Sequence, residues 1–213
     1  MNQSKFLQWA VWGGLSFVIL AVGIAFLVGG PRARLKGLST GSGSLPVIKP
    51  LSEFSLTNQL GQVVSVDSLA GHPWVANVFF SRCPSICVKM TQRMKEIQDS
   101  VPPESPLRLV SISTDPDHDQ PEVLTRYAKR FGADSGRWFF LTGEKSEIAR
   151  AIQKELLLAV QENAEDQRQS ELDLYTHSSL LVLVDKDSRV RATYESLGTN
   201  TVAEIVADLK RLD

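Results

Sequence analysis

Apolar and polar residues follow one another along the chain with periods that distinguish strands from helices. Continuous short apolar runs, or runs of period two, predict strands, whereas apolar residues three or four positions apart predict helices. The predicted strands cover residues 54–56, 63–66, 74–80, 107–113, 138–141, 180–184 and 190–194. The predicted helices cover residues 84–98, 121–131, 146–158 and 201–212. From residue 74 onward, the predicted strands and helices therefore largely alternate.

This order of elements predicts an α/β domain. Strands that alternate with helices pair in parallel through crossover connections. The segments around residues 58–61 and 185–188 are turns between neighbouring strands, and such hairpins are antiparallel. A mixed sheet flanked by helices, with a hairpin and a helix at the end of the chain, is the layout of a thioredoxin-like fold.

The N-terminal segment has a different pattern. From Phe6 to Val28 there is no charged residue, and a helix of about 20 residues spans a bilayer core. Trp9 and Trp12 stand where interfacial aromatic residues would be expected. A signal peptide has a shorter apolar core of about 7–15 residues. We therefore expect an uncleaved transmembrane helix over residues 6–28.

Length and composition are consistent with one domain and an attachment. The chain has 213 residues, is 43% hydrophobic and carries a net charge of -1. A net charge so close to zero does not suggest nucleic-acid binding. We expect an N-terminal anchor with its flanks over residues 1–36, a flexible Gly/Ser-rich linker over residues 37–49 and the globular domain over residues 50–213.

The two cysteines of the chain, Cys83 and Cys87, are the main candidates for chemistry. They follow the strand 74–80 and meet the start of the next helix, whose positive end lowers the pKa of a thiol. We expect two exposed, acidified thiols on one helix face, able to bind a soft metal or to form a disulfide. The alternative is that both cysteines are small buried core residues.

Three segments resemble the SCO/SenC family. The first is Val78-Phe-Phe-Ser-Arg-Cys-Pro-Ser-Ile-Cys87, similar to the Cys-Pro-x-x-Cys signature of that family. The others are Ser111-Ile-Ser-Thr-Asp-Pro-Asp-His-Asp-Gln-Pro121 and Tyr175-Thr-His-Ser-Ser, the latter similar to the segment with the family's copper-binding histidine. Val88 and Gln120 depart from the usual proline and threonine. The resemblance covers the chain from about Pro50 onward.

The resemblance implies a copper site formed by Cys83, Cys87 and His177. Two thiolates and an imidazole suit Cu(I), and a further ligand would allow Cu(II). Zinc is the competing metal, but structural zinc sites have four protein ligands and only three good candidates are present. Of the other histidines, His72 is expected in a solvated turn. His118 lies among Asp115, Asp117 and Asp119, either a hard-cation site or, more simply, a turn-forming segment with solvated charges.

Two functions remain open. The resemblance implies a copper metallochaperone that assists copper-site assembly in cytochrome c oxidase, with the oxidase copper subunit and other copper chaperones as partners; catalytic turnover is not implied. The alternative is a membrane-tethered thiol-disulfide oxidoreductase that reduces partner cysteines with the redox-capable pair Cys83 and Cys87. A thiol peroxidase is disfavoured because Ala76 and Phe80 stand where proline and threonine would be needed.

The location is expected to be the bacterial inner membrane. Only five residues precede the span, too few for a mitochondrial presequence. Lys5 precedes the span and Arg32, Arg34 and Lys36 follow it, so the positive-inside rule alone would keep the domain in the cytoplasm. The three segments that resemble the SCO/SenC family imply the opposite orientation, with the domain facing the periplasm or the cell exterior.

Overall fold

The computed structural model describes residues 43–164, 166 and 174–212, together with the isolated positions 12, 16 and 20. The residues from Ser44 onward form one compact unit. The transmembrane helix expected over residues 6–28 lies almost wholly outside the described residues. Within the part of the chain that the structure describes, no helix is long and apolar enough to cross a membrane.

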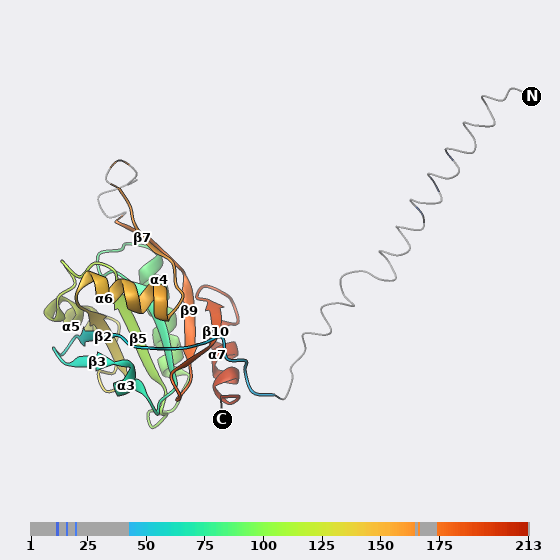
Figure 1. Cartoon of the computed structure of the whole chain (residues 1–213), viewed down its shortest axis with the longest axis horizontal. Coiled ribbons are helices and arrows are strands. Elements are labelled where there is room, and N and C mark those ends of the chain that lie inside the picture. The colour runs from blue at the N-terminus through green and yellow to red at the C-terminus, as the bar shows by residue number, and fades with distance from the viewer. Residues whose placement is uncertain are drawn as a thin grey trace, which may run out of the picture. The chain divides into compact units, whose positions relative to one another are not determined.

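The unit is built on a mixed sheet of eight strands (Figure 1), in the order β1-β10-β9-β4-β5-β6-β2-β3. The strands are β1 (Lys49–Pro50), β2 (Ser55–Asn58), β3 (Val63–Ser65), β4 (Trp74–Phe79), β5 (Arg108–Ser113), β6 (Trp138–Thr142), β9 (Leu180–Val184) and β10 (Arg189–Glu195). The central strands β4, β5 and β6 are parallel, and β9 joins β4 in antiparallel orientation. The prediction of a mixed, thioredoxin-like sheet is confirmed.

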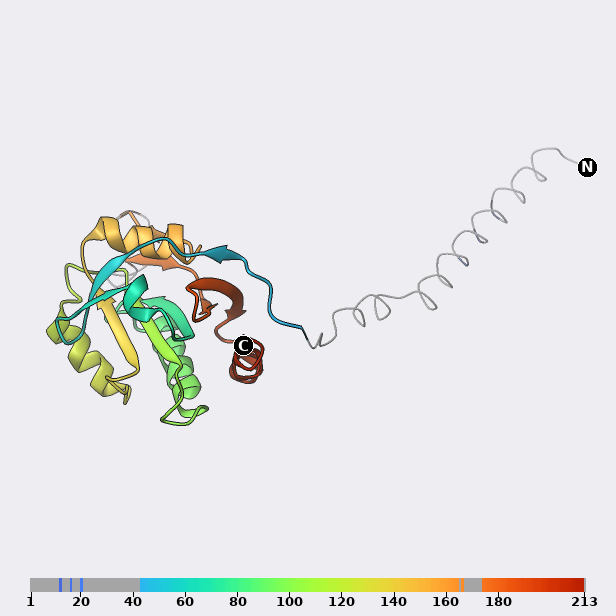
Figure 2. The same ribbon diagram turned by 60° about the horizontal axis from the view of Figure 1, so that its bottom comes forward.

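Helices cover both faces of this sheet. They are α3 (Val66–Leu69), α4 (Ile86–Asp99), α5 (Pro121–Arg130), α6 (Lys145–Ala149), the π-helix η1 (Arg150–Glu155) and α7 (Thr201–Leu209). Figure 2 shows α6 and η1 on one side of the sheet and α4 and α7 on the other. The alternation of β4 explains this arrangement, because Val75 and Phe79 point into one core while Trp74 and Val78 point into the other. Both cores lie within the compact unit, so it has what it needs to fold as a domain of its own.

A buried polar chain crosses the central strands. Trp138 Nε1 donates to Ser111 Oγ over 2.9 Å, and Ser111 Oγ donates to Asn77 Oδ1 over 2.6 Å. This chain explains why an asparagine can stand in the otherwise apolar strand β4, since its side-chain oxygen is satisfied. It also links β4, β5 and β6, the three parallel strands at the centre of the sheet.

Several predicted boundaries were wrong. The first crossover helix begins at Ile86, not at residue 84, because Pro84 and Ser85 still belong to the loop. The helix expected over residues 146–158 is interrupted by the wider π-turns of η1 and ends at Glu155. The last helix ends at Leu209.

The sequence analysis also missed three strands. One is β1, which pairs with the edge strand β10. The others are β7 (Val160–Glu162) and β8 (Tyr175–His177), which form a separate two-stranded antiparallel sheet. Most of the polar segment 163–170, expected as a surface loop or insertion between them, lies outside the described residues.

Candidate functional site

Cys83 and Cys87 lie where β4 leads into α4. β4 ends at Phe79, Cys83 follows in the connecting loop, and Cys87 is the second residue of α4. Cys83 is therefore not part of the helix, and the expectation that the two thiols share a helix face was wrong. Both cysteines are free and buried rather than exposed. They stay close because the loop turns tightly, with the amide of Cys83 bonded to the carbonyl of Phe80 over 3.2 Å.

The two thiols have very different acidities. A hydrogen bond from Cys87 lowers the pKa of Cys83 to about 5; burial opposes this shift, and the amides of Ser85 and Cys87 support it. The pKa of Cys87 is raised, because its proton is held in the bond to Cys83 and because the side chain is buried. At neutral pH Cys83 is therefore the thiolate, and Cys87 keeps its proton.

His177 reaches the cysteines from β8. Its Nε2 lies 3.1 Å from Cys87 Sγ, and its Nδ1 lies 3.0 Å from the carbonyl oxygen of Ser178. A carbonyl oxygen only accepts, so Nδ1 carries a proton and donates it. In the neutral ring, Nε2 then has a free lone pair that faces Cys87. His177 is the last residue of β8 (Tyr175–His177).

Phe80 packs against the strand that carries His177. The ring of Phe80 lies edge-on to His177 at a centroid distance of 6.2 Å and to Tyr175 at 5.5 Å. Since Phe80 comes between β4 and Cys83, it joins the cysteine loop to β8. Nothing in the sequence pattern pointed to this role, although Phe80 stands only three positions before the first cysteine.

The three side chains form two contacts rather than a closed triangle. Cys87 donates a hydrogen bond to Cys83, and Cys87 Sγ faces His177 Nε2. Across the described ranges, no group of three His, Cys, Asp or Glu side chains is arranged to hold a metal ion. The chemistry of the donors nevertheless fits copper, because two sulfur atoms and an imidazole nitrogen with a free lone pair are soft to intermediate ligands.

The acidic segment 115–119 supports the cysteine loop. Asp119 is fully buried and accepts from the backbone amide of Ser81 over 2.9 Å, from the hydroxyl of Ser81 and from the hydroxyl of Ser113 over 2.5 Å. Asp115 accepts two bonds from Arg82, of 2.6 and 3.0 Å. The prediction that these charges are solvated was wrong for Asp115 and Asp119. Ser81 and Arg82, the two residues before Cys83, occupy both oxygens of Asp119 and Oδ2 of Asp115, which argues against a hard-cation site.

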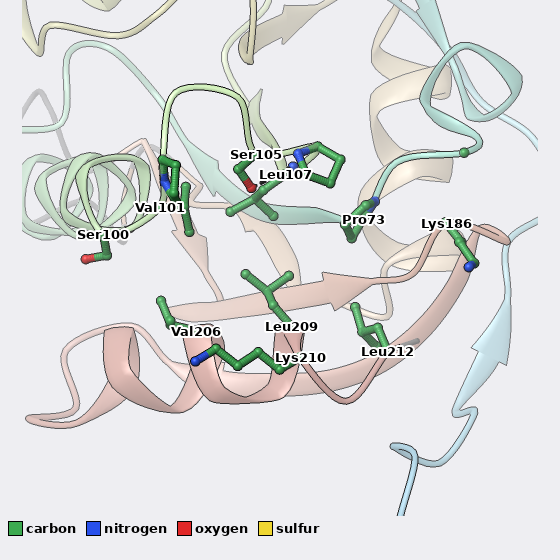
Figure 3. A pocket seen from close by; sticks show the side chains of 13 residues that line it. Pro73, Ser100, Val101, Ser105, Leu107, Lys186, Val206, Leu209, Lys210 and Leu212 are labelled. Atoms are coloured by element: carbon green, nitrogen blue, oxygen red, sulfur yellow. Dashed lines mark hydrogen bonds between the residues drawn. The ribbon is translucent and has the colours of Figure 1, made fainter.

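Another cavity lies at the other end of the sheet. It has a volume of about 490 Å³ and is lined mainly by apolar side chains from α7 and from the loop before β5. Figure 3 shows Leu209 and Leu107 facing each other across it, with Pro73 on its wall. Pro73 precedes the first residue of β4, whereas the cysteines follow its last residue. This cavity is therefore separate from the candidate site.

Comparison with known proteins identifies the family. A model of the SCO1/SenC family matches residues 48–212. The SCO1 protein homolog of Bacillus subtilis is 32% identical over 168 residues, which cover 78% of this chain and 83% of that protein. A putative copper-binding protein of Stutzerimonas stutzeri is 28% identical over 149 residues, or 69% of this chain and 70% of that protein.

A solved structure has the same fold. It is that of BsSco, described as a member of the Sco family of cytochrome c oxidase assembly proteins, in which a disulfide switch was identified. The two chains are 29% identical and superpose with a TM-score of 0.68, over 80% of this chain and 98% of the other. The chain belongs to the SCO1/SenC family.

Proposed function

We propose that this protein is a copper chaperone that holds copper through Cys83, Cys87 and His177 and assists copper-site assembly in cytochrome c oxidase. The observation that carries the proposal is the 3.1 Å contact between Cys87 Sγ and His177 Nε2. Their positions are 90 residues apart in the chain, and the contact directs an imidazole nitrogen to a sulfur atom, a donor pair that suits Cu(I). The names of the related proteins support copper and oxidase assembly.

The protonation of the two cysteines and the orientation of the His177 ring both suit the binding of a soft metal. Copper, when bound, supplies a centre that thiolates and imidazole can share and pass on by ligand exchange. Cys83 is already deprotonated at neutral pH, whereas Cys87 must lose its proton before its sulfur becomes a full ligand. The bond from His177 Nδ1 to the carbonyl of Ser178 fixes the ring so that Nε2 remains the donor atom.

We further propose that the domain is held at the bacterial inner membrane by a helix over residues 6–28 and faces the periplasm or the cell exterior. The uncharged composition of that segment supports an anchor. Alkaline phosphatase fused after the last residue tests the orientation. It should be active, because this enzyme needs disulfides that form outside the cytoplasm; activity only of a cytoplasmic reporter in the same place would contradict this orientation.

Copper content of the purified domain tests the metal site. A chain that begins at Gly43 should bind one copper ion per molecule, and the variants Cys83→Ser, Cys87→Ser and His177→Ala should each lose tight binding. His118→Ala is the matched control, since His118 is an exposed histidine within the acidic segment. Full copper retention in the two cysteine variants would disprove the assignment.

Thiol-disulfide exchange is a second candidate function, favoured by the unequal acidity of the two cysteines. A thiolate at Cys83 can attack a partner disulfide, and the protonated Cys87 can then resolve the mixed disulfide after losing its proton. His177→Ala separates the two functions. It should impair oxidase assembly at limiting copper while leaving disulfide formation between Cys83 and Cys87 intact. Undiminished assembly would favour thiol exchange as the main activity.

A further inference from the structure

A groove of about 670 Å³ lies beside the candidate metal site. It is formed by the end of η1, the segment that leads into β7, and the β7–β8 sheet, and His177 is one of its nine lining residues. None of these nine described residues is Asp, Glu, Lys or Arg. The polar ones are amides and hydroxyls, such as those of Gln161 and Thr176. The groove is therefore uncharged apart from any charge on His177 itself.

One lining residue, Leu157, has an unfavourable backbone conformation. Its φ is +57°, and Ser188 is the one other non-glycine residue with positive φ in the described segments. The conformation arises because the amide of Leu158 bonds back to the carbonyl of Ile152 over 2.9 Å and closes the end of η1. Such left-handed positions at helix ends normally take glycine, which has no Cβ to clash with the following carbonyl oxygen, or asparagine, whose polar side chain can hydrogen-bond to the local backbone.

Burial does not compensate for this strain. The side chain of Leu157 is 54% exposed, whereas the adjacent Leu156 and Leu158 are buried in the core. Helix termination would favour glycine at position 157, and solvent exposure would favour a polar residue. A leucine satisfies neither requirement, and residues that break local rules without a structural gain gather at functional sites.

We propose that this groove docks an uncharged, apolar segment of the protein that receives copper, with Leu157 as the main contact. The proposal rests on the proposed function, because it gives a role to a surface that shares His177 with the metal site. A charged segment would lose hydration in the groove without gaining an oppositely charged partner. An apolar segment would bury Leu157 and bring its own metal-binding side chains next to His177.

Copper transfer to two synthetic peptides tests this docking. Both peptides have blocked ends and contain Cys-Gly-Ser-Gly-Cys; one is flanked by Leu, Ile and Val, the other by Gly and Ser. The protein begins at Gly43 and is loaded with Cu(I). Leu157→Asn is compared with Leu60→Asn, because Leu60 is also 54% exposed but lies in the β2–β3 turn and does not line the groove.

Leu157→Asn should slow transfer to the apolar-flanked peptide about fivefold, the loss expected when half of a leucine side chain is no longer buried. It should leave transfer to the Gly/Ser-flanked peptide unchanged, and Leu60→Asn should change neither rate. The melting temperature of Leu157→Asn should be no lower than that of Leu60→Asn, because asparagine tolerates positive φ. Leu157→Gly provides a second variant with the same expected rates.

Two results would overturn the docking proposal while leaving the copper site intact. One is equal transfer by wild type and both Leu157 variants to the apolar-flanked peptide. The other is equally fast transfer to a third peptide flanked by Lys and Glu. A failure of the proposed function looks different: wild type would hold no Cu(I), or His177→Ala would hold as much as wild type before any peptide is added.

Discussion

Asp119 binds Ser81, two residues before Cys83, through both the backbone amide and the hydroxyl of the serine. The carboxylate thereby fixes the path of the chain between β4 and the cysteines. Since Asp119 also accepts from Ser113 at the end of β5, it ties the cysteine loop to the neighbouring strand. The loop is thus held from the side of the sheet, while His177 approaches from β8.

The first prediction concerns this carboxylate. Asp119→Asn turns an acceptor oxygen into an amide that faces hydrogen-bond donors, so we expect a loss of about 1–3 kcal/mol in the free energy of unfolding. Cu(I) affinity should fall as well, because the loop would no longer hold Cys83 in place. Urea denaturation and competition with a Cu(I) chelator measure the two effects. Asp117→Asn is the control, since Asp117 is exposed and pairs with Lys145 at the surface; equal effects of both variants would contradict the prediction.

A second prediction follows from the low pKa of Cys83. Its rate of alkylation by a small reagent should be nearly constant from pH 8 to pH 6 and fall to half near pH 5, where the thiolate takes up its proton. Cys87→Ala removes the hydrogen bond that stabilises the thiolate most, so the midpoint should move up toward the ordinary pKa of 9.0. Rates that rise steeply between pH 6 and pH 8 in wild type would show that Cys83 is an ordinary thiol.

Phe80 provides a third prediction. Phe80→Leu keeps most of the apolar volume but removes the edge-on ring contacts with His177 and Tyr175. Stability should fall by less than about 1.5 kcal/mol, whereas Cu(I) affinity should fall several-fold because His177 is less firmly placed. Phe79→Leu is the control, as Phe79 packs against Tyr127 and Phe140 instead. If Phe79→Leu weakens Cu(I) binding as much as Phe80→Leu does, the contact between Phe80 and His177 is not the cause of the loss.

The fourth prediction concerns acid stability. Burial would raise the pKa of Asp185, but hydrogen bonds from Arg191 and Arg189 outweigh it and lower this pKa. A carboxylate with a lowered folded-state pKa stabilises the protein above its unfolded pKa, and this stabilisation is lost as the pH falls through the folded-state value. Stability should therefore decline below about pH 4, the ordinary range of aspartate.

Asp185→Asn isolates this contribution. The variant should be less stable at pH 7, since the buried Arg191 loses its anionic partner, and its stability should vary less between pH 5 and pH 3. Guanidinium denaturation at several pH values provides the measurement. Asp187→Asn serves as the control, because Asp187 is an exposed partner of Arg189. If the stability of wild type and of Asp185→Asn changed with pH in the same way, Asp185 would not be the source of the acid sensitivity.

The central elements could be predicted because their residues carry strong periodic signals. β4 is a continuous apolar run and the apolar positions of α4, including Met90, Met94 and Ile97, repeat at helical spacing, so both were recognised from the sequence. β7 and β8 have three residues each and no fully buried position, so they are too short and too exposed to give a periodic apolar signal. Their pairing depends on contacts between distant segments, which a local pattern does not contain.

The same limit applies to the site. The spacing of Cys83 and Cys87 pointed to paired thiols, but their burial and unequal acidity depend on how the loop packs. The contact between Asp119 and Ser81 joins positions 38 residues apart, so the acidic segment gave no sign of its role as a support. Positive φ at Leu157 likewise comes from the way η1 ends, which the sequence analysis had expected to be an ordinary helix.

The separate β7–β8 sheet has a kinetic consequence for the proposed metal site. A two-stranded sheet is only marginally stable by itself, so it can open while the eight-stranded sheet stays folded. Each opening would carry the imidazole away from Cys87 and leave the two sulfurs in place. The residence time of the nitrogen ligand would then depend on the rate at which this two-stranded sheet opens. A partner protein that binds the sheet would change the rate of copper release without disturbing the domain core.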